Sequence, residues 1–254
     1  MKRISILAGL AWLMLSGISS AQLTSVIKGG PHDLSSGSAL TNSNSTIDAQ
    51  TCIFCHVPHG GSNSIPLWNR SNPSAGSYSV YASTTLMQTE TAANVVGGVS
   101  GACLSCHDGS IALDVLTNVN GVAKPTGFVT FSQGVNSKAN YGNSGSGVKD
   151  IMTLAGTISN PLPFLGQDLR NDHPVAVSYD TAYSGDTSHY SNRGANAYLT
   201  AGSGNVKLPL YTTTGVTGLS VECSSCHASH DNTLGNFLRV ANTGSQMCLG
   251  CHKK

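Results

Sequence analysis

The sequence predicts an irregular, coil-dominated fold with few short helices and strands. Only 10% of the residues are charged and 6% are aromatic, while 29 of the 254 are glycine. Such a chain offers little apolar area to offset the entropy that it loses on folding. Its periodic stretches are also short and are interrupted by Gly, Pro, Asn and Ser. A third observation, a cysteine and histidine motif that occurs four times, indicates that a covalently bound group supplies much of the core.

The motif first occurs at residues 52–56, which read Cys-Ile-Phe-Cys-His. Two cysteines separated by two residues and followed directly by histidine form the attachment signature of c-type haem. The thiols form thioethers with the porphyrin, and the histidine is the proximal iron ligand. All eight cysteines belong to copies of this motif, so we predict four covalently attached c-type haems and a core of stacked haems. The attachment residues and proximal ligands are Cys52, Cys55 and His56; Cys103, Cys106 and His107; Cys223, Cys226 and His227; and Cys248, Cys251 and His252.

Paired cysteines also occur in structural zinc sites, redox dithiols and disulfide frameworks. None of these requires histidine directly after the second cysteine. With nine histidines in the chain, chance would place one after all four pairs with a probability on the order of one in a million. The spacing therefore favours haem.

The first residues read as an export signal. Met1, Lys2 and Arg3 precede an apolar run from Ile4 to Ile18, and Ser19, Ser20 and Ala21 follow it. A basic start, a short apolar run and small residues are typical of a cleavable signal peptide, here residues 1–21. An uncleaved anchor is the alternative, but the run is short for a membrane span, so we expect no retained membrane anchor. Export agrees with haem attachment outside the cytoplasm.

The mature chain is expected to contain two modules. Residues 22–125 form an N-terminal dihaem module, residues 126–165 a loop or linker, and residues 166–254 a C-terminal dihaem module. The linker is placed by the absence of Cys and His from residues 110–165 and by the stretch from Gly134 to Gly147, which is rich in Gly, Ser and Asn.

Few regular elements are expected within the modules. Residues 29–33 read as a turn that presents a histidine, and residues 41–50 as a polar loop. Apolar spacing predicts a short helix near residues 84–96, and alternation predicts strands at residues 175–179 and 206–213. The segment 184–204 is polar and contains glycine, and it holds His189.

Five histidines remain once the proximal ligands are set aside: His32, His59, His173, His189 and His230. Four of them are enough to give every iron a second imidazole. Methionine is the other common distal ligand of haem iron, but it is scarce outside the signal, so we predict bis-histidine ligation and low reduction potentials. His59 and His230 each follow a proximal histidine by three residues, a spacing that lets them ligate a neighbouring haem rather than their own.

The histidine order repeats in the two halves. Each half contains a single histidine, then a motif whose histidine is followed three residues later by another histidine, and then a motif without such a histidine. His189 lies outside this pattern. The simplest assignment keeps the ligands within each half. It gives His32 to the His56 haem and His59 to the His107 haem, and likewise His173 to the His227 haem and His230 to the His252 haem.

The chain resembles the multihaem c-type cytochromes of metal-reducing bacteria. Among these, it resembles most closely the extracellular tetrahaem cytochromes that polymerise into conductive nanowires. The matching stretches extend over most of the mature chain: residues 30–33, 52–59, 67–70, 103–109, 173–174, 223–230 and 248–252. The loops between them match no family that we can name.

The resemblance implies a coil-dominated fold in which haems stack alternately parallel and crossed. It also implies that a neighbouring subunit donates one histidine ligand. His32 is the candidate donor, to the His252 haem of the next subunit, in which case His189 enters the coordination sphere within the chain.

The function expected is therefore electron transfer without catalysis, through a secreted homopolymer at the cell surface that serves redox partner proteins or extracellular acceptors. A soluble periplasmic tetrahaem shuttle is the alternative. A multihaem reductase of the nitrite or hydroxylamine type needs an iron with an open position, and the histidine supply does not favour one. No basic run indicates binding to nucleic acid.

Overall fold

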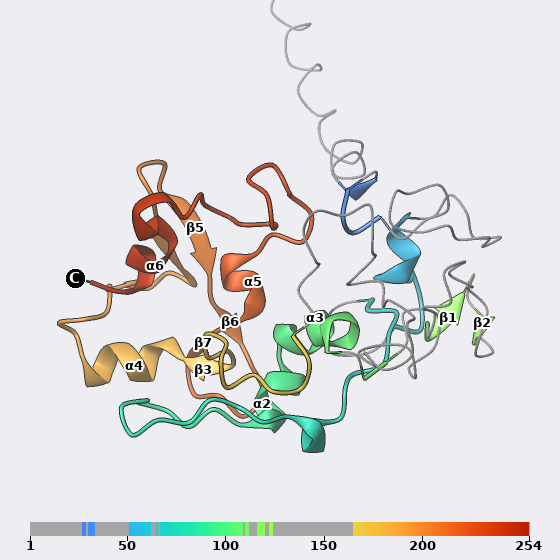
Figure 1. Ribbon diagram of the computed structural model, residues 1–254, viewed down its shortest axis with the longest axis horizontal. Helices are drawn as coiled ribbons and strands as arrows, with labels where there is room; N and C mark the ends of the chain where they lie inside the picture. The colour runs from blue at the N-terminus through green and yellow to red at the C-terminus, as the bar shows by residue number, and fades with distance from the viewer. Residues whose placement is uncertain are drawn as a thin grey trace, which may run out of the picture.

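The regular elements of this protein are short and are joined by long irregular connections (Figure 1). The computed structural model describes residues 27–28, 30–33, 51–61, 65, 67–108, 110–111, 116–119, 122–123 and 165–253. The expected signal peptide, the loop at residues 41–50 and the glycine-rich stretch at residues 134–147 lie outside these ranges.

The N-terminal part of the described chain is mainly helical and turn-like. Its elements are η1 (Thr51–Phe54), η2 (Ala75–Ser77), α2 (Ala92–Gly97), α3 (Val99–His107) and the two-residue strands β1 (Asn118–Val119) and β2 (Val122–Ala123). In Figure 1 the β1–β2 pair lies at the opposite end of the molecule from α6.

The C-terminal part contains two small antiparallel sheets, β3–β7–β6 and β4–β5. Its elements are β3 (Val177–Ser178), α4 (Tyr179–Gly185), β4 (Tyr198–Ala201), β5 (Val206–Pro209), β6 (Tyr211–Thr212), β7 (Leu219–Val221), α5 (Cys223–Cys226), η5 (Thr243–Ser245) and α6 (Gln246–Cys251). Contacts join α3 to α5 and α6 to β4. Because α3, α5 and α6 carry the cysteines of the second, third and fourth motifs, these motifs are held against regular structure.

The helix expected near residues 84–96 begins later, at Ala92. Thr91 caps it, because its side chain accepts a hydrogen bond of 3.1 Å from the backbone N–H of Asn94. Before the cap, the buried carboxylate of Glu90 accepts backbone N–H bonds from Tyr81 (2.9 Å) and Val175 (3.0 Å). That tertiary role holds residues 84–90 outside the helix.

The expected strands are also shorter than predicted. Residues 175–179 contribute only β3, because Ser178 accepts a 3.0 Å bond from the N–H of Thr181 and so caps α4. Residues 206–213 divide into β5 and β6, which belong to different sheets, and the break follows Pro209. The polar segment 184–204 also contains β4, which pairs with β5 from Tyr198 to Ala201.

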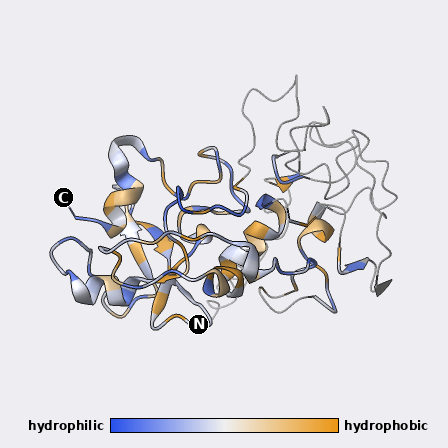
Figure 2. Ribbon diagram, turned by 60° about the horizontal axis from the view of Figure 1, so that its bottom comes forward, coloured by the Kyte–Doolittle hydropathy of each residue, from blue (hydrophilic) through white to orange (hydrophobic). Residues whose placement is uncertain are grey.

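Two small apolar clusters form the core of the described residues, and Figure 2 shows short apolar stretches alternating with polar ones along the ribbon. The first cluster joins residues of both halves: Tyr78, Val95, Val96, Leu104, Leu169 and Ala176. The second lies under α6 and contains Tyr179, Leu199, Ala201, Leu208, Leu210 and Val240.

Gly250 allows α6 to lie close to the β4–β5 sheet. A Cβ atom at this position would lie 2.7 Å from Leu208 Cδ1 and 2.9 Å from Ala201 Cβ, closer than two carbons can approach. The fourth motif, Cys248 to His252, is thereby fixed on the second cluster.

Candidate haem-binding sites

Three of the four motifs share one local structure. In the first, His56 forms an isolated antiparallel bridge with Trp68. The N–H of Val57 donates to the carbonyl of Leu67 (2.8 Å), and the N–H of Asn69 donates to the carbonyl of Cys55 (2.9 Å). The motif histidine is therefore held between two backbone bonds, one on each side.

The third and fourth motifs repeat this arrangement. His227 bridges Leu238, with Ala228 N–H donating to Phe237 O (2.7 Å) and Arg239 N–H donating to Cys226 O (2.9 Å). His252 bridges Tyr190, with bonds from Lys253 N–H to His189 O (2.8 Å) and from Ser191 N–H to Cys251 O (2.9 Å).

The second motif differs, because it lies on α3 and His107 is the last residue of that helix. The carbonyl of His107 accepts a 3.0 Å bond from the N–H of Leu165, and Asp108 N–H donates to Leu104 O (3.1 Å). Leu104, inside the motif, is buried in the first cluster. Leu104, a residue of the motif itself, thus holds α3 against the first cluster.

The histidine rings gather in three pairs. Ring centroids lie 6.2 Å apart for His32 and His107, 6.2 Å for His56 and His230, and 6.4 Å for His173 and His252. Each pair contains one motif histidine and one histidine from outside the motifs. Within the described ranges, His227 is the motif histidine for which no ring partner at this spacing is found.

The spacing fits two imidazoles on opposite sides of one iron. A ligand nitrogen lies about 2.0 Å from its metal and about 1.2 Å from the centre of its own ring, so the two centroids are expected about 6.4 Å apart. The ring planes cross at 63°, 48° and 62°, which two axial rings can adopt by rotation about their bonds to the iron.

These pairs differ from the simplest assignment made from the sequence. His32 faces the ring of His107 rather than that of His56, and His173 faces the ring of His252 rather than that of His227. His230 faces His56, in the other half of the chain. The ring pairs therefore differ from that assignment for these three histidines, because spacing along the chain does not determine which motif lies opposite a histidine.

The tautomer of three rings follows from their hydrogen bonds. Nδ1 lies 3.3 Å from Ser229 O in His32, 2.9 Å from Pro174 O in His173 and 2.8 Å from Asn236 O in His227. A carbonyl oxygen only accepts, so Nδ1 must carry a proton, and in the neutral ring Nε2 then keeps its lone pair. A free Nε2 is what an iron ligand requires.

Burial favours the neutral form of two rings. Burial, together with the nearby His107, His230 and His227, lowers the pKa of His32 to about 4, although the bond to Ser229 opposes the shift. His32 also stacks on Phe237 with 4.0 Å between centroids. Burial, followed by the nearby His173 ring, lowers the pKa of His252 as well. Both rings are therefore neutral at neutral pH, as ligation demands.

Among the residues that the structure describes, no two of the eight cysteines form a disulfide. Burial raises the pKa of Cys55 and of Cys251 to about 12. The thiols of Cys103 and Cys223 interact directly, and the pKa of Cys103 is raised mainly by this hydrogen bond and by burial. The second and third motifs thus meet at their first cysteines, where α3 contacts α5.

Trp68 provides a polar group that suits a haem propionate. Its ring packs edge-on against His56, with centroids 5.5 Å apart at 82°. Its Nε1–H is buried and has no hydrogen-bond partner in the described part of the chain. An isolated buried donor costs about 1–3 kcal/mol, which a carboxylate beside the first motif would offset. The donor set around His56 therefore fits a c-type haem.

The other sequence candidates lie at the surface or have structural partners. His59 is exposed. His189 is also exposed, and its Nδ1 lies 2.6 Å from Asp186 Oδ2. Arg70, within the stretch 67–70 noted in the sequence, is fully buried and donates to Ser105 O at 2.9 Å.

Sequence reasoning missed two residues that the structure brings to the sites. Phe237 stacks on His32, and Glu222 binds the start of α3 through its buried carboxylate. Alignment of the first and third motifs would have indicated Phe237, since it takes the position of Leu67 beside the bridge. No local pattern marks Glu222, whose partners are distant in sequence.

Comparison with protein-family models matches residues 218–254 to the doubled CXXCH motif. This motif indicates a multihaem c-type cytochrome, with covalent c-type haem and a role in electron transfer. A search of curated proteins gave no match. Within the described ranges, no group of three or more His, Cys, Asp and Glu side chains that could hold a metal ion is present, and no helix is long and apolar enough to cross a membrane.

Proposed function

We propose that this protein is a tetrahaem electron carrier in which two imidazoles close every iron. The observation that supports this best is the set of three histidine pairs at 6.2–6.4 Å, each joining a motif histidine to one from outside the motifs. The doubled CXXCH motif supports haem attachment at the last two sites, and the other two copies repeat the same residues.

The bound haems supply one-electron chemistry, because each iron alternates between ferric and ferrous states. The two cysteines of each motif would hold a porphyrin by thioethers, and the motif histidine and one further histidine would ligate its iron. An iron with two protein ligands has no position for a substrate, so the arrangement favours transfer over catalysis. Two imidazoles also favour low potentials, since methionine ligation is what raises them.

The test is spectroscopic and uses the mature holoprotein. A pyridine haemochrome assay is expected to give four c-type haems per chain. The ferric form is expected to be entirely low-spin by electron paramagnetic resonance, and the ferrous form is expected not to bind carbon monoxide. A high-spin iron or carbon monoxide binding would refute closed ligation and favour a reductase.

We further propose that the carrier is exported and forms a homopolymer at the cell surface that delivers electrons to extracellular acceptors. This rests on the family resemblance and on the export signal expected at residues 1–21. Electron microscopy of material sheared from cells tests it. Filaments that contain this chain are expected, and discrete particles confined to the periplasm would favour a soluble shuttle instead.

A further inference from the structure

We infer that the first and third motifs exchange their distal ligands: His230 ligates the iron of the haem attached beside His56, and His59 ligates the iron of the haem attached beside His227. The inference deepens the proposed bis-histidine ligation and rests on it. It assigns His59 to a haem in the other half of the chain, rather than to the neighbouring second motif.

The first and third motifs have the same local structure. In both, the residue after the motif histidine donates its N–H to a carbonyl, to Leu67 at 2.8 Å and to Phe237 at 2.7 Å. These two acceptors share a positive φ, 62° for Leu67 and 56° for Phe237. His59 and His230 follow their motif histidines by the same three residues, so they occupy equivalent positions in equivalent segments.

The other histidine pairs obey the same equivalence. In each half, the histidine that precedes the motifs faces the second motif of its own half: His32 faces His107, and His173 faces His252. This pair of a preceding histidine with a second motif therefore occurs once in each half. His230, which follows the third motif, faces His56 of the first motif. By the same equivalence, His59, which follows the first motif, is paired with His227 of the third motif.

The remaining histidines lead to the same assignment. His189 is held at the fourth motif, because its carbonyl accepts from Lys253 N–H and its ring is paired with Asp186. His59 instead lies three residues from His56, whose ring is 6.2 Å from His230. Three residues span at most about 10 Å, so His59 and His227 lie on two short segments that already face each other. The ring of His59 is exposed and makes no hydrogen bond to any residue that the structure describes.

The exchange is tested in the holoprotein with His59→Ala and, as a matched control, His189→Ala, which removes another exposed histidine. Ferric spin state is measured by electron paramagnetic resonance. We expect His59→Ala to convert one of the four haems to high spin, exogenous imidazole to restore it, and His189→Ala to leave all four low-spin. Four low-spin haems in His59→Ala would overturn the inference.

A second comparison identifies the haem that loses its ligand. In a chain without the second haem (Cys103→Ser and Cys106→Ser), His59→Ala is expected still to produce a high-spin iron. In a chain without the third haem (Cys223→Ser and Cys226→Ser), it is expected to produce none. The reverse result would assign His59 to the second motif and overturn the exchange.

Dilution of the wild-type holoprotein to monomers separates a ligand of the same chain from one given by another copy. All four haems are expected to stay low-spin, whereas a high-spin fraction that grows on dilution would overturn exchange within the chain. If the haem-deleted chains do not mature, His59→Met in the full chain is the substitute. It is expected to give one haem with a methionine ligand and a raised potential, and four unchanged potentials would overturn the inference.

The two proposals fail in different ways. A wild-type holoprotein with a high-spin iron before any substitution would refute closed ligation itself. A fully low-spin wild type with an unaffected His59→Ala variant would refute only the exchange.

Discussion

The buried carboxylate of Glu222 is predicted to hold the second and third motifs together. It is 1% exposed and accepts hydrogen bonds from both the backbone N–H (3.1 Å) and the hydroxyl of Ser100, at the start of α3. Its other oxygen accepts from the hydroxyls of Thr213 (2.5 Å) and Ser220 (3.1 Å). The residue directly precedes Cys223, so it joins α3 to the third motif.

Replacing Glu222 with Leu or with Gln separates the possible contributions. Leucine leaves the N–H and the hydroxyl of Ser100 buried without this acceptor, whereas the Thr213 hydroxyl can turn to Ser220 Oγ at 2.7 Å. Two buried donors that lose their acceptor cost about 3 kcal/mol together. Glutamine keeps one oxygen for Ser100 and presents its NH₂ group to hydroxyls that can rotate to accept it, so its cost is about 1 kcal/mol.

The assay is guanidinium unfolding of the holoprotein, followed by far-ultraviolet circular dichroism and by the Soret absorbance. The expected losses in free energy of unfolding are about 3 kcal/mol for Leu and about 1 kcal/mol for Gln, with an unchanged dependence on denaturant. Equal losses for the two variants, or a Leu variant as stable as the wild type, would refute the reasoning.

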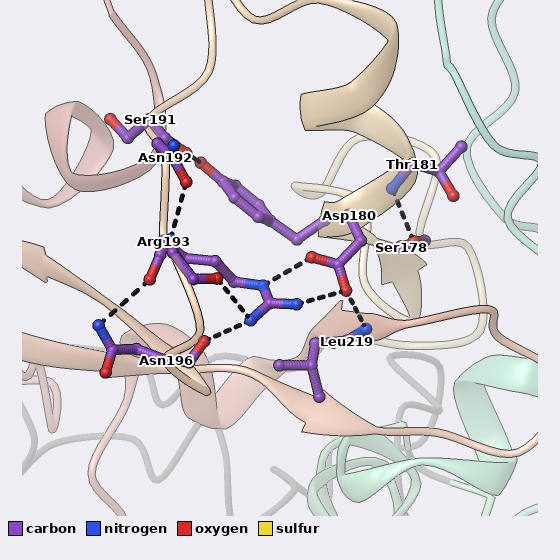
Figure 3. A network of polar contacts seen from close by, with 10 residues as sticks. Ser178, Asp180, Thr181, Ser191, Asn192, Arg193, Asn196 and Leu219 are labelled. Atoms are coloured by element: carbon purple, nitrogen blue, oxygen red, sulfur yellow. Dashed lines mark hydrogen bonds and ion pairs between the residues drawn. The ribbon is translucent and has the colours of Figure 1, made fainter.

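Three further perturbations test other contacts. In Figure 3 the guanidinium of Arg193 faces Asp180, with contacts of 2.6 and 2.8 Å, and it lowers the pKa of that carboxyl. The ion pair therefore contributes to the stability of the protein above about pH 4, and this contribution is lost as the pH falls further. Asp180→Asn should therefore destabilise the protein by about 1 kcal/mol at pH 7 and by less near pH 3, as measured by thermal unfolding across pH. Trp68→Phe removes the buried indole N–H and should destabilise the holoprotein by about 1 kcal/mol if a propionate accepts from it; a stabilised variant would show that the donor stays without a partner. Phe237→Ala removes the ring stacked on His32, and we expect part of one haem to become high-spin, with reversal by imidazole; a fully low-spin spectrum would contradict that positioning role.

The doubled CXXCH motif at residues 218–254 could be recognised from sequence because its chemistry depends on a fixed local spacing. Two thiols and one imidazole must reach the same porphyrin, so they lie within five residues. The internal repeat was visible for the same reason. Short helices and strands were placed less well, as in the helix expected near residues 84–96, where Glu90 accepts backbone bonds from residues far along the chain and delays the helix to Ala92.

The distal partners could not be predicted from sequence because each depends on long-range packing. His230 faces His56, 174 positions away by residue number, and no pattern around either residue records that contact. Glu222 and Ser100 are likewise 122 residues apart. The sequence did show that the histidine order is equivalent in the two halves. This equivalence indicates further histidine partners once the structure gives one ring pair of each kind.

The ring pairs also bear on how fast such a carrier could exchange electrons. The chain alone holds three imidazole pairs with centroids 6.2–6.4 Å apart, so the proposed bis-histidine ligation would require little rearrangement of these rings. His32 illustrates why. Its ring is neutral because burial lowers its pKa to about 4, and it is oriented by Phe237 and by the bond from Nδ1 to Ser229 O. Ligands fixed by contacts outside the iron keep their positions when the charge on the iron changes, and a site that needs little rearrangement is suited to electron transfer. Because the contacts that orient His32 come from Ser229 and Phe237, which follow the third motif, the C-terminal half of the chain positions the ring that faces His107 in the N-terminal half.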